Sequence, residues 1–339
     1  MANDTLRLYR KYIFVLVRYG ITLLYQRVQA AAHSWTYREV SSPKNVVILG
    51  GSFAGIQLAK RLTETLPTGY RIVLIEKNSH FNYVFNFPRY SVLQGHEQKA
   101  FIPYSGLAKD SPKGILELVQ DLATDIADGE VELKSGGRVK FEYLAIATGT
   151  RQNPPAQVRG TEKVDGCGEL GNMQKQIEVS KSIAIVGGGP VGVQLAGDIK
   201  TFYEDKHVVL IHSRQRLLPN FGKVLHDYVI DAMVRMGVTV MLDERPRLPD
   251  GTGPLTLHFK DGKSEQFDLV VGHSQISRCQ PPLTSSHRSL AQDKPPTHPY
   301  SVDLDPKLSP QRLEGSSSSP PSRSCSITVN LRIDPAYSL

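Results

Sequence analysis

A strand, a glycine-rich turn and a helix occur twice in this sequence, and this duplication constrains the fold more than any other feature. The apolar run at residues 45–49 is followed by a glycine turn at 50–55, and the run at 182–186 by a glycine turn at 187–192. Short, continuously apolar strands are typical of parallel sheets that are buried on both faces. The pattern therefore predicts an α/β protein with two Rossmann-like dinucleotide-binding domains.

Each turn leads into a segment with helical spacing of apolar residues and then into another apolar strand. The predicted helices after the turns cover residues 54–66 and 193–202, and the strands that follow them cover 71–75 and 207–211. A further helix is predicted at 224–236, and further strands at 131–134, 138–141, 143–147, 238–242, 255–259 and 267–271.

The first turn has the residue types of a phosphate site. Backbone amides that carry no bulky side chain can approach a pyrophosphate, and the helix N-terminus adds partial positive charge. The strand after the helix ends in an acid about twenty residues beyond the last glycine, where a carboxylate can bind both ribose hydroxyls. Ser52 stands where the motif usually has a glycine, and its side chain narrows the backbone's approach to the phosphate. The alternative interpretation of the segment is a tight turn that binds no ligand. The predicted residues are Gly50, Gly51, Ser52, Ala54, Gly55 and Glu76.

The second turn has all three motif glycines, and its second strand ends in His212 rather than in an acid. Without an acid the 2′-phosphate of NADP is not repelled, and Arg214 or Arg216 can pair with it. We therefore expect NADH and NADPH both to be accepted, with weak discrimination. The alternative for His212 is a solvated strand end. The predicted residues are Gly187, Gly188, Gly189, Gly192, His212 and Arg214.

The combination of these motifs resembles the flavoproteins with two dinucleotide-binding domains. Within that group it resembles the apoptosis-inducing-factor-like, ferroptosis-suppressor-type NAD(P)H:quinone reductases, which are relatives of the type II NADH dehydrogenases. The narrower resemblance rests on residues 81–89, 99–104 and 206–213, and the whole covers residues 44–271. It implies FAD in the first domain, NAD(P)H in the second and a quinone-like electron acceptor.

The resemblance also implies roles for residues outside the glycine turns. Arg89 is expected to reach the cofactor, unless it only forms a local salt bridge, and Ala123 to offer its backbone to the adenine. Thr148 and Gly149 mark a crossing between the domains where the backbone touches the first cofactor. Gln194 stands near the nicotinamide–flavin contact, where many relatives carry Glu. No catalytic side chain and no metal site are predicted.

Residues 1–43 form a separate basic segment. Six basic residues against one acid in residues 1–38 account for most of the net charge of +7, and the near-balanced remainder argues against a nucleic-acid partner. Apolar runs interrupted by Arg18 and Gly20 are too short for a spanning helix. Three interpretations remain: an interfacial membrane helix, a mitochondrial transit peptide, and a helix packed on its own domain. The first predicts a cytoplasmic, peripherally membrane-associated protein, with mitochondria as second choice.

The predicted domains are an incomplete FAD-binding domain at 44–155, an NAD(P)H-binding domain at 156–271 and a disordered, non-family tail at 272–339. The tail is rich in Pro and Ser, and residues 273–279 do not match the C-T-G-type segment with which relatives continue. We interpret residues 272–326 as translated intron or a shifted frame, with the C-terminal domain missing. Residues 327–337 again resemble a family strand.

The function that this sequence predicts is hydride transfer from NAD(P)H to flavin, with electrons passing on to a quinone-like acceptor. The three cysteines are far apart, so no dithiol centre is expected. Three alternatives remain. The chain is a catalytically impaired nucleotide-binding remnant without the flavin ribityl-binding segment, a flavin monooxygenase or ferredoxin-type reductase, or a membrane-surface interaction protein.

Overall fold

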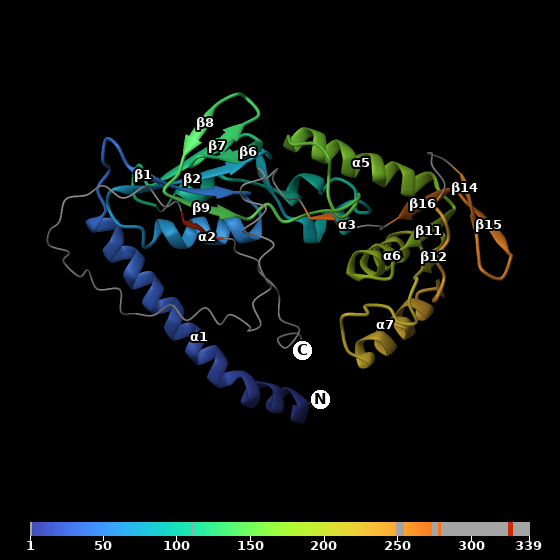
Figure 1. The fold of residues 1–339 in the computed structure, drawn as a ribbon. Coiled ribbons are helices and arrows are strands. Elements are labelled where there is room, and N and C mark those ends of the chain that lie inside the picture. Colours follow the sequence, from blue (N-terminus) through green and yellow to red (C-terminus); the bar gives the residue numbers. More distant parts are fainter. Residues whose placement is uncertain (1, 110, 249–253, 273–276, 279–324, 328–339) are drawn as a thin grey trace.

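The computed structural model describes residues 2–109, 111–248, 254–272, 277–278 and 325–327. Two α/β halves lie side by side, and each is built on a parallel sheet (Figure 1). The prediction of two Rossmann-like domains is therefore confirmed. Most of the tail predicted over residues 272–339 lies outside the described residues.

The first half contains a parallel sheet in the strand order β18-β9-β1-β2-β5. Strands β1 and β2 pair without a register shift along their shared length, as expected for the core of a βαβ unit. The bounds are β1 (Lys44–Leu49), α2 (Phe53–Thr63), β2 (Tyr70–Glu76), β5 (Leu116–Gln120), β9 (Tyr143–Ile146) and β18 (Cys325–Ile327).

Alternate residues of β1 and β2 pack on opposite faces of this sheet, which explains why both runs are continuously apolar. Ile48 and Leu74 pack toward Ala59 of α2. Val47 and Val73 belong to the core on the other face, together with Val131, which lies in an antiparallel meander that covers this face (Figure 1). The meander strands are β6 (Ala123–Ala127), β7 (Glu130–Leu133) and β8 (Arg138–Lys140).

The second half repeats this plan with the parallel strand order β13-β12-β11-β16. Ile185 and Leu210 pack with Leu195 and Met233 from two helices, whereas Val209 packs on the other face against Phe267 of a hairpin. The bounds are β11 (Ser182–Val186), α6 (Pro190–Phe202), β12 (His207–Ile211), α7 (Lys223–Arg235), β13 (Val238–Met241), β14 (Leu255–His258), β15 (Ser264–Phe267) and β16 (Leu269–Gly272).

A segment of short elements and one long helix joins the two halves. Phe87 and Phe101 of this segment pack against Leu170 of α5 (Lys163–Val179), while Val92 enters the core of the second half. Strand β10 (Thr150–Arg151) pairs with β17 (Ser277–Arg278). The short elements are β3 (His80–Asn82), η1 (Val84–Asn86), α3 (Phe87–Tyr90), η2 (Glu97–Ala100), β4 (Phe101–Pro103) and α4 (Ser105–Ala108).

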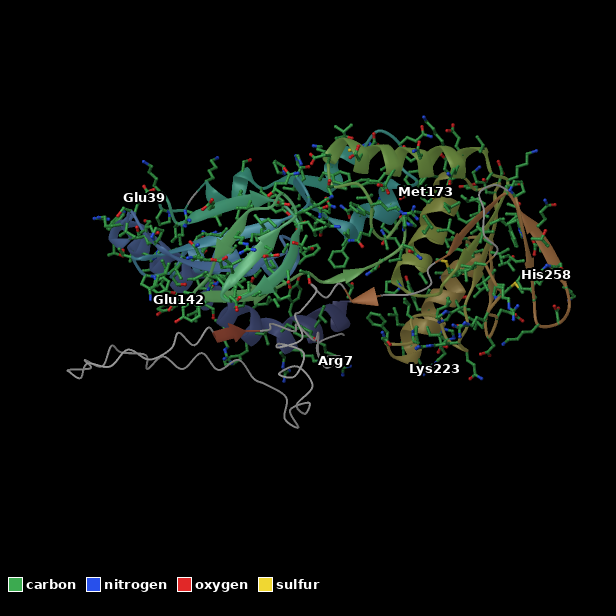
Figure 2. The ribbon with its side chains drawn as sticks, turned by 45° about the horizontal axis from the view of Figure 1, so that its top comes forward. Arg7, Glu39, Glu142, Met173, Lys223 and His258 are labelled. Atoms are coloured by element: carbon green, nitrogen blue, oxygen red, sulfur yellow. The ribbon has the colours of Figure 1, made fainter. Side chains whose placement is uncertain are left out.

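Helix α1 (Ala2–Thr36) projects from the first half, and among the described residues it is attached near its C-terminal end (Figure 1). There, Nε2 of His33 lies 2.7 Å from the carbonyl oxygen of Leu66, and the Tyr37 hydroxyl donates to the carbonyl of Tyr70 over 2.9 Å. In Figure 2, Arg7 on α1 lies on the side of the molecule opposite Met173 on α5. Within the part of the chain that the structure describes, no helix has the length and apolarity needed to cross a membrane.

The structure agrees with the predicted elements to within a few residues, with two exceptions. Residues 77–130, for which the sequence predicts no helix or strand, contain β3 to β6 and the short helices. Helix α5 was not predicted at all. Strand β18 lies just before and at the start of the segment that resembles a family strand, and it pairs in parallel with β9.

Candidate functional site

The first glycine turn is shaped by close backbone packing. Gly50 has a φ of +100°, and a Cβ there would lie 2.5 Å from the carbonyl oxygen of Ala147. A Cβ on Gly55 would lie only 1.7 Å from the carbonyl oxygen of Gly50. Both positions therefore require glycine, because a side chain would separate β1 from β9 or push α2 away from the turn. As a result, the N-terminus of α2 lies close to the end of β1.

Glu76 braces this turn from the end of β2. Its Oε2 accepts the Gly51 N–H at 2.5 Å, and its Oε1 accepts the backbone and side-chain N–H groups of Asn78 at 2.9 and 2.7 Å. A carboxylate offers about four acceptor positions, so capacity remains for a ribose hydroxyl. The Tyr104 hydroxyl donates to the Gly51 carbonyl at 2.7 Å, and burial together with Glu76 raises the pKa of that phenol. Tyr104 thus stays a neutral donor that fixes the Gly51 peptide.

A cavity of about 580 Å³ opens beside this turn. Its walls come from the turn, from the end of β2, from the segment before β6 and from the segment after β9. A cavity that joins a glycine turn to a strand-end acid fits an extended dinucleotide. Ala54 and Gly55 lie behind the turn in α2 and are not in its wall. The predicted residues that line the cavity are Gly50, Gly51, Ser52, Glu76, Ala123, Thr148 and Gly149.

Arg89 is the predicted FAD-site residue that the structure places elsewhere. Its guanidinium forms an ion pair with Asp198 of α6 at 3.2 Å and lies 5.8 Å from the ring centroid of Phe202. It does not line the cavity. The alternative, that Arg89 forms a salt bridge, agrees with this ion pair, whose partner belongs to the other half. The reason is that α3 packs on α6, which brings a carboxylate close to this side chain. A role of Arg89 at the cofactor stays a prediction.

The second turn repeats the packing of the first. A Cβ on Gly192 would lie 1.9 Å from the carbonyl oxygen of Gly187, whose φ is +135°. The Gly188 N–H donates to Nδ1 of His212 at 3.1 Å, so a neutral His212 carries its proton on Nε2. Gly189 is the N-cap of α6, and no atom lies within 4 Å of the position that its Cβ would take. This open N-terminus leaves room for a phosphate.

His212 is partly buried rather than a solvated strand end. Burial is the main cause that lowers the pKa of the His212 imidazole, and the positive charge of Arg214 lowers it further. The carbonyl of Arg216 opposes this shift. The ring is therefore neutral near pH 7 and braces the turn as an acceptor. Arg214 itself is exposed, where it remains accessible to an anionic ligand.

The helices that follow the two glycine turns are linked through Phe85 of η1. Phe53, the first residue of α2, packs against Phe85 with a centroid distance of 5.0 Å. The Phe85 carbonyl accepts a long hydrogen bond of 3.5 Å from Nε2 of Gln194 in α6. The helices that begin at the two glycine turns are thereby linked through one residue of η1. Both helices therefore contact the same short segment of the first half.

Sequence reasoning missed Asn78, Tyr104 and Asp198 as parts of this region. Tyr104 lies in the 99–104 stretch that carries the resemblance, but nothing in the stretch indicates that its hydroxyl reaches Gly51. Asp198 follows Gln194 by one helical turn and so shares its face of α6, which is a signal that could have been used. The binding roles of the predicted residues remain predictions.

Comparison with known proteins identifies this architecture. The family model described as pyridine nucleotide-disulphide oxidoreductase matches residues 44–273. Proteins of this family are flavoproteins that use FAD and NAD(P)H. The cavity beside the first turn and the open N-terminus of α6 fit these two groups.

Similar proteins include Fe-regulated protein 8 of Mycosarcoma maydis, which is 33% identical over 67% of this chain and 63% of its own length. Human ferroptosis suppressor protein 1 is 33% identical over 60% of this chain and 54% of its own length. The chain thus spans about half to two thirds of the length of the curated relatives it matches.

Solved structures show the same fold. A ferredoxin reductase from Rhodopseudomonas palustris superposes with a TM-score of 0.55 at 18% identity, over 69% of this chain and 59% of that structure. NDH2 of Plasmodium falciparum in complex with NADH superposes with a TM-score of 0.54 at 16% identity, over 69% of this chain and 56% of that structure. Given the duplicated fold, the two braced glycine turns and the match over residues 44–273, this chain belongs to the pyridine nucleotide-disulphide oxidoreductase family.

Proposed function

We propose that this protein is an FAD-dependent NAD(P)H oxidoreductase that passes electrons on to a quinone-like acceptor. The observation that carries the proposal is the link between the two glycine turns through Phe53, Phe85 and Gln194. Two nucleotides bound at helix N-termini that meet at one boundary can bring their reactive rings together. The proposal assigns residues 44–155 to FAD and residues 156–271 to NAD(P)H.

The residues of this chain bind and orient; the cofactors supply hydride transfer from nicotinamide to flavin. Glu76 would accept hydrogen bonds from hydroxyls of the FAD ribose, and the N-terminus of α2 would bind the pyrophosphate. The N-terminus of α6 would do the same for the nicotinamide nucleotide, with Arg214 available to a 2′-phosphate. Gln194 carries an uncharged amide next to Phe85, so it holds no proton during turnover.

An apolar two-electron acceptor is supported by two observations. The sequence has no closely spaced cysteine pair, so it contains no dithiol motif that would carry the electrons. Phe53 and Phe85 remain 39% and 64% exposed beside the turns, and aromatic rings of this kind favour a flat apolar ligand.

We further propose that α1 binds the surface of a membrane. Its apolar side chains are exposed, with Phe14 at 76% and Leu24 at 65%, and its basic residues include Arg10, Lys11 and Arg18. Such a helix buries apolar side chains at the lipid headgroup boundary and attracts anionic lipids. This supports peripheral association on the cytoplasmic side. The location of a fluorescent C-terminal fusion in cells distinguishes cytoplasmic membrane surfaces from mitochondria.

The test of the catalytic proposal is flavin content together with NADH and NADPH oxidation, with and without a short-chain quinone. A yellow preparation whose NADH oxidation rises with the quinone supports the proposal. A colourless preparation that still binds NADH contradicts it and supports the nucleotide-binding remnant. Oxygenation of an organic substrate in place of quinone reduction would support a monooxygenase.

The test of membrane binding is flotation with vesicles that contain or lack anionic lipid. Each basic residue near an anionic surface contributes about 1 kcal/mol, so Arg10→Glu with Lys11→Glu should weaken binding more than tenfold. Lys113→Glu with Lys263→Glu is the matched control, because these lysines are 94% and 83% exposed on the globular part. Equal binding by the two double variants contradicts the proposal.

A further inference from the structure

Asp198 is a carboxylate at the boundary between the two halves. It lies in α6, and its side chain is only 10% exposed. Oδ1 pairs with the Arg89 guanidinium at 3.2 Å, while Oδ2 is buried and has no hydrogen-bond partner among the described residues. A carboxylate in such a position needs a physical reason, because burial of a half-satisfied charge opposes folding.

Arg89 meets this carboxylate from the first half of the chain. Arg89 lies in α3, directly after the η1 segment that contains Phe85. The guanidinium is half exposed, and Phe202 of α6 lies beneath it. Arg89 therefore contacts α6 twice, through Asp198 and through an aromatic face.

The second contact between the same elements is one helical turn away. Gln194 of α6 donates to the Phe85 carbonyl, and Phe85 packs on Phe53 at the start of α2. Since Gln194 and Asp198 are four residues apart, they share one face of α6. Two points on one helix face are thus attached to one short segment, residues 85–89, which fixes both the position and the rotation of α6.

We propose that Asp198 is a positioning residue that, through Arg89, fixes the helix of the second glycine turn against α3 of the first half. This inference rests on the proposed function, because its consequence is the alignment of two bound rings. A displacement of about 1 Å from productive geometry can lower a rate by about a hundredfold. A contact that fixes α6 would therefore be retained even where it adds nothing to stability.

The stability of the fold does not explain Asp198. Burial is the main cause that raises the pKa of the Asp198 carboxyl, and the opposing effects of Arg89 and of a hydrogen bond with the Gln194 side chain are smaller. The Arg89 side chain would remain solvated without its partner. A role in geometry rather than in stability is the explanation that fits these observations.

The test is a double-mutant cycle of Asp198→Asn and Arg89→Gln, followed by rapid mixing of the flavin-loaded protein with NADH. Each single variant should lower the flavin-reduction rate about tenfold, while the Kd for NADH changes less than about twofold. The double variant should be no slower than either single variant, because both remove one contact. Asp198→Glu should recover part of the rate.

Asp227→Asn is the matched control, since Asp227 forms an exposed ion pair with Lys223 within α7 of the same half. It should leave the flavin-reduction rate unchanged. A rate for Asp198→Asn equal to that of this control overturns the proposal. Single effects that multiply in the double variant also overturn it, because Arg89 would then act on a ligand and not through Asp198.

A second measurement is independent of bound flavin. Hydrogen exchange should become faster in residues 87–90 and 190–202 of Asp198→Asn, and in the control only in residues 223–235. If the wild-type protein holds no flavin, the proposed function fails while this exchange pattern still tests the contact. Unchanged exchange in residues 190–202 overturns the inference.

Discussion

The backbone N–H of Gly51 donates a 2.5 Å hydrogen bond to Oε2 of Glu76, so the residue that ends β2 braces the turn that follows β1. The second half repeats this relationship, with the Gly188 N–H donating to Nδ1 of His212 at 3.1 Å. The two strand ends thus perform the same structural task with an anion in one half and a neutral ring in the other. Charge, rather than position, is what distinguishes the two predicted ribose sites.

Glu76→Ala should lose both the brace of the first turn and the acceptor for the ribose. We expect the flavin-to-protein absorbance ratio to fall about tenfold, and the free energy of unfolding to fall by about 1–3 kcal/mol, because the Gly51 N–H loses its partner. Glu76→Gln should lie between this variant and wild type. Glu117→Ala serves as the control. It removes a half-exposed acid of the neighbouring strand β5, which pairs with Arg71 of β2. Flavin retention by Glu76→Ala equal to this control would contradict the assignment.

His212→Glu should give the second half the charge of the first. An acid at this strand end repels the 2′-phosphate of NADPH and accepts the ribose hydroxyls of NADH. We expect the KM for NADPH to rise about tenfold or more relative to that for NADH. Arg214→Ala should shift the ratio in the same direction by removing a cation. An unchanged ratio of the two KM values in both variants would show that the strand end does not face the ribose.

The central strands of both sheets were predictable because burial on two faces requires continuously apolar residues, whereas the edge strand β5 was not. Val46 to Leu49 and Ile183 to Ile185 show this. Helix α5 was not predictable from local preference, since Gly166, Gly168 and Gly171 lie within it. It forms because Leu170 and Ile177 are buried against neighbours, and because Gly166 lets Phe101 approach, where a Cβ would lie 2.5 Å from the ring.

The candidate site was predictable only as far as its motifs are local. Each glycine turn and its strand-end residue lie within one βαβ unit, so Glu76 and His212 could be placed from spacing. The partner of Arg89 lies 109 residues further along the chain. Nothing in the sequence indicates that α3 packs on α6. The family resemblance assigns Arg89 to the cofactor, so it does not indicate the contact with Asp198 either.

His212 should make the protein less stable in mild acid. Its folded pKa is lowered, mainly by burial, so the unfolded chain binds the proton more readily. The contribution of His212 to stability is therefore fully present above its ordinary pKa of about 6.5 and is lost as pH falls through the lowered folded value. Urea unfolding midpoints of wild type and His212→Gln should differ in slope below about pH 6.5. Parallel curves would contradict a buried, neutral ring.

Tyr37→Phe should loosen the attachment of α1. The Tyr37 hydroxyl donates to the Tyr70 carbonyl at 2.9 Å, and Tyr37 is 5% exposed. Its removal leaves a partly buried carbonyl without this donor, which should lower the free energy of unfolding by about 1 kcal/mol. Tyr228→Phe, at a position that is 67% exposed on α7, should change it by much less. Equal effects of the two substitutions in urea unfolding would contradict the attachment.

Asp198→Asn should be at least as stable as wild type near pH 7, although it transfers hydride more slowly. The folded pKa of Asp198 is raised, mainly by burial. Its favourable contribution to stability is therefore present below the unfolded value of about 3.9 and is lost as pH rises through the raised folded value. The Arg89 guanidinium and a hydrogen bond with the Gln194 side chain lower this pKa, but each effect is smaller than that of burial. Near pH 7 the ionised carboxylate thus costs stability, and an amide removes that cost.

Urea unfolding at several pH values should show the free energy of unfolding of wild type rising relative to that of the variant as pH falls. A variant that is clearly less stable near pH 7 would mean that the ion pair holds the fold together, and a loss of flavin reduction would then follow from unfolding rather than from misaligned rings.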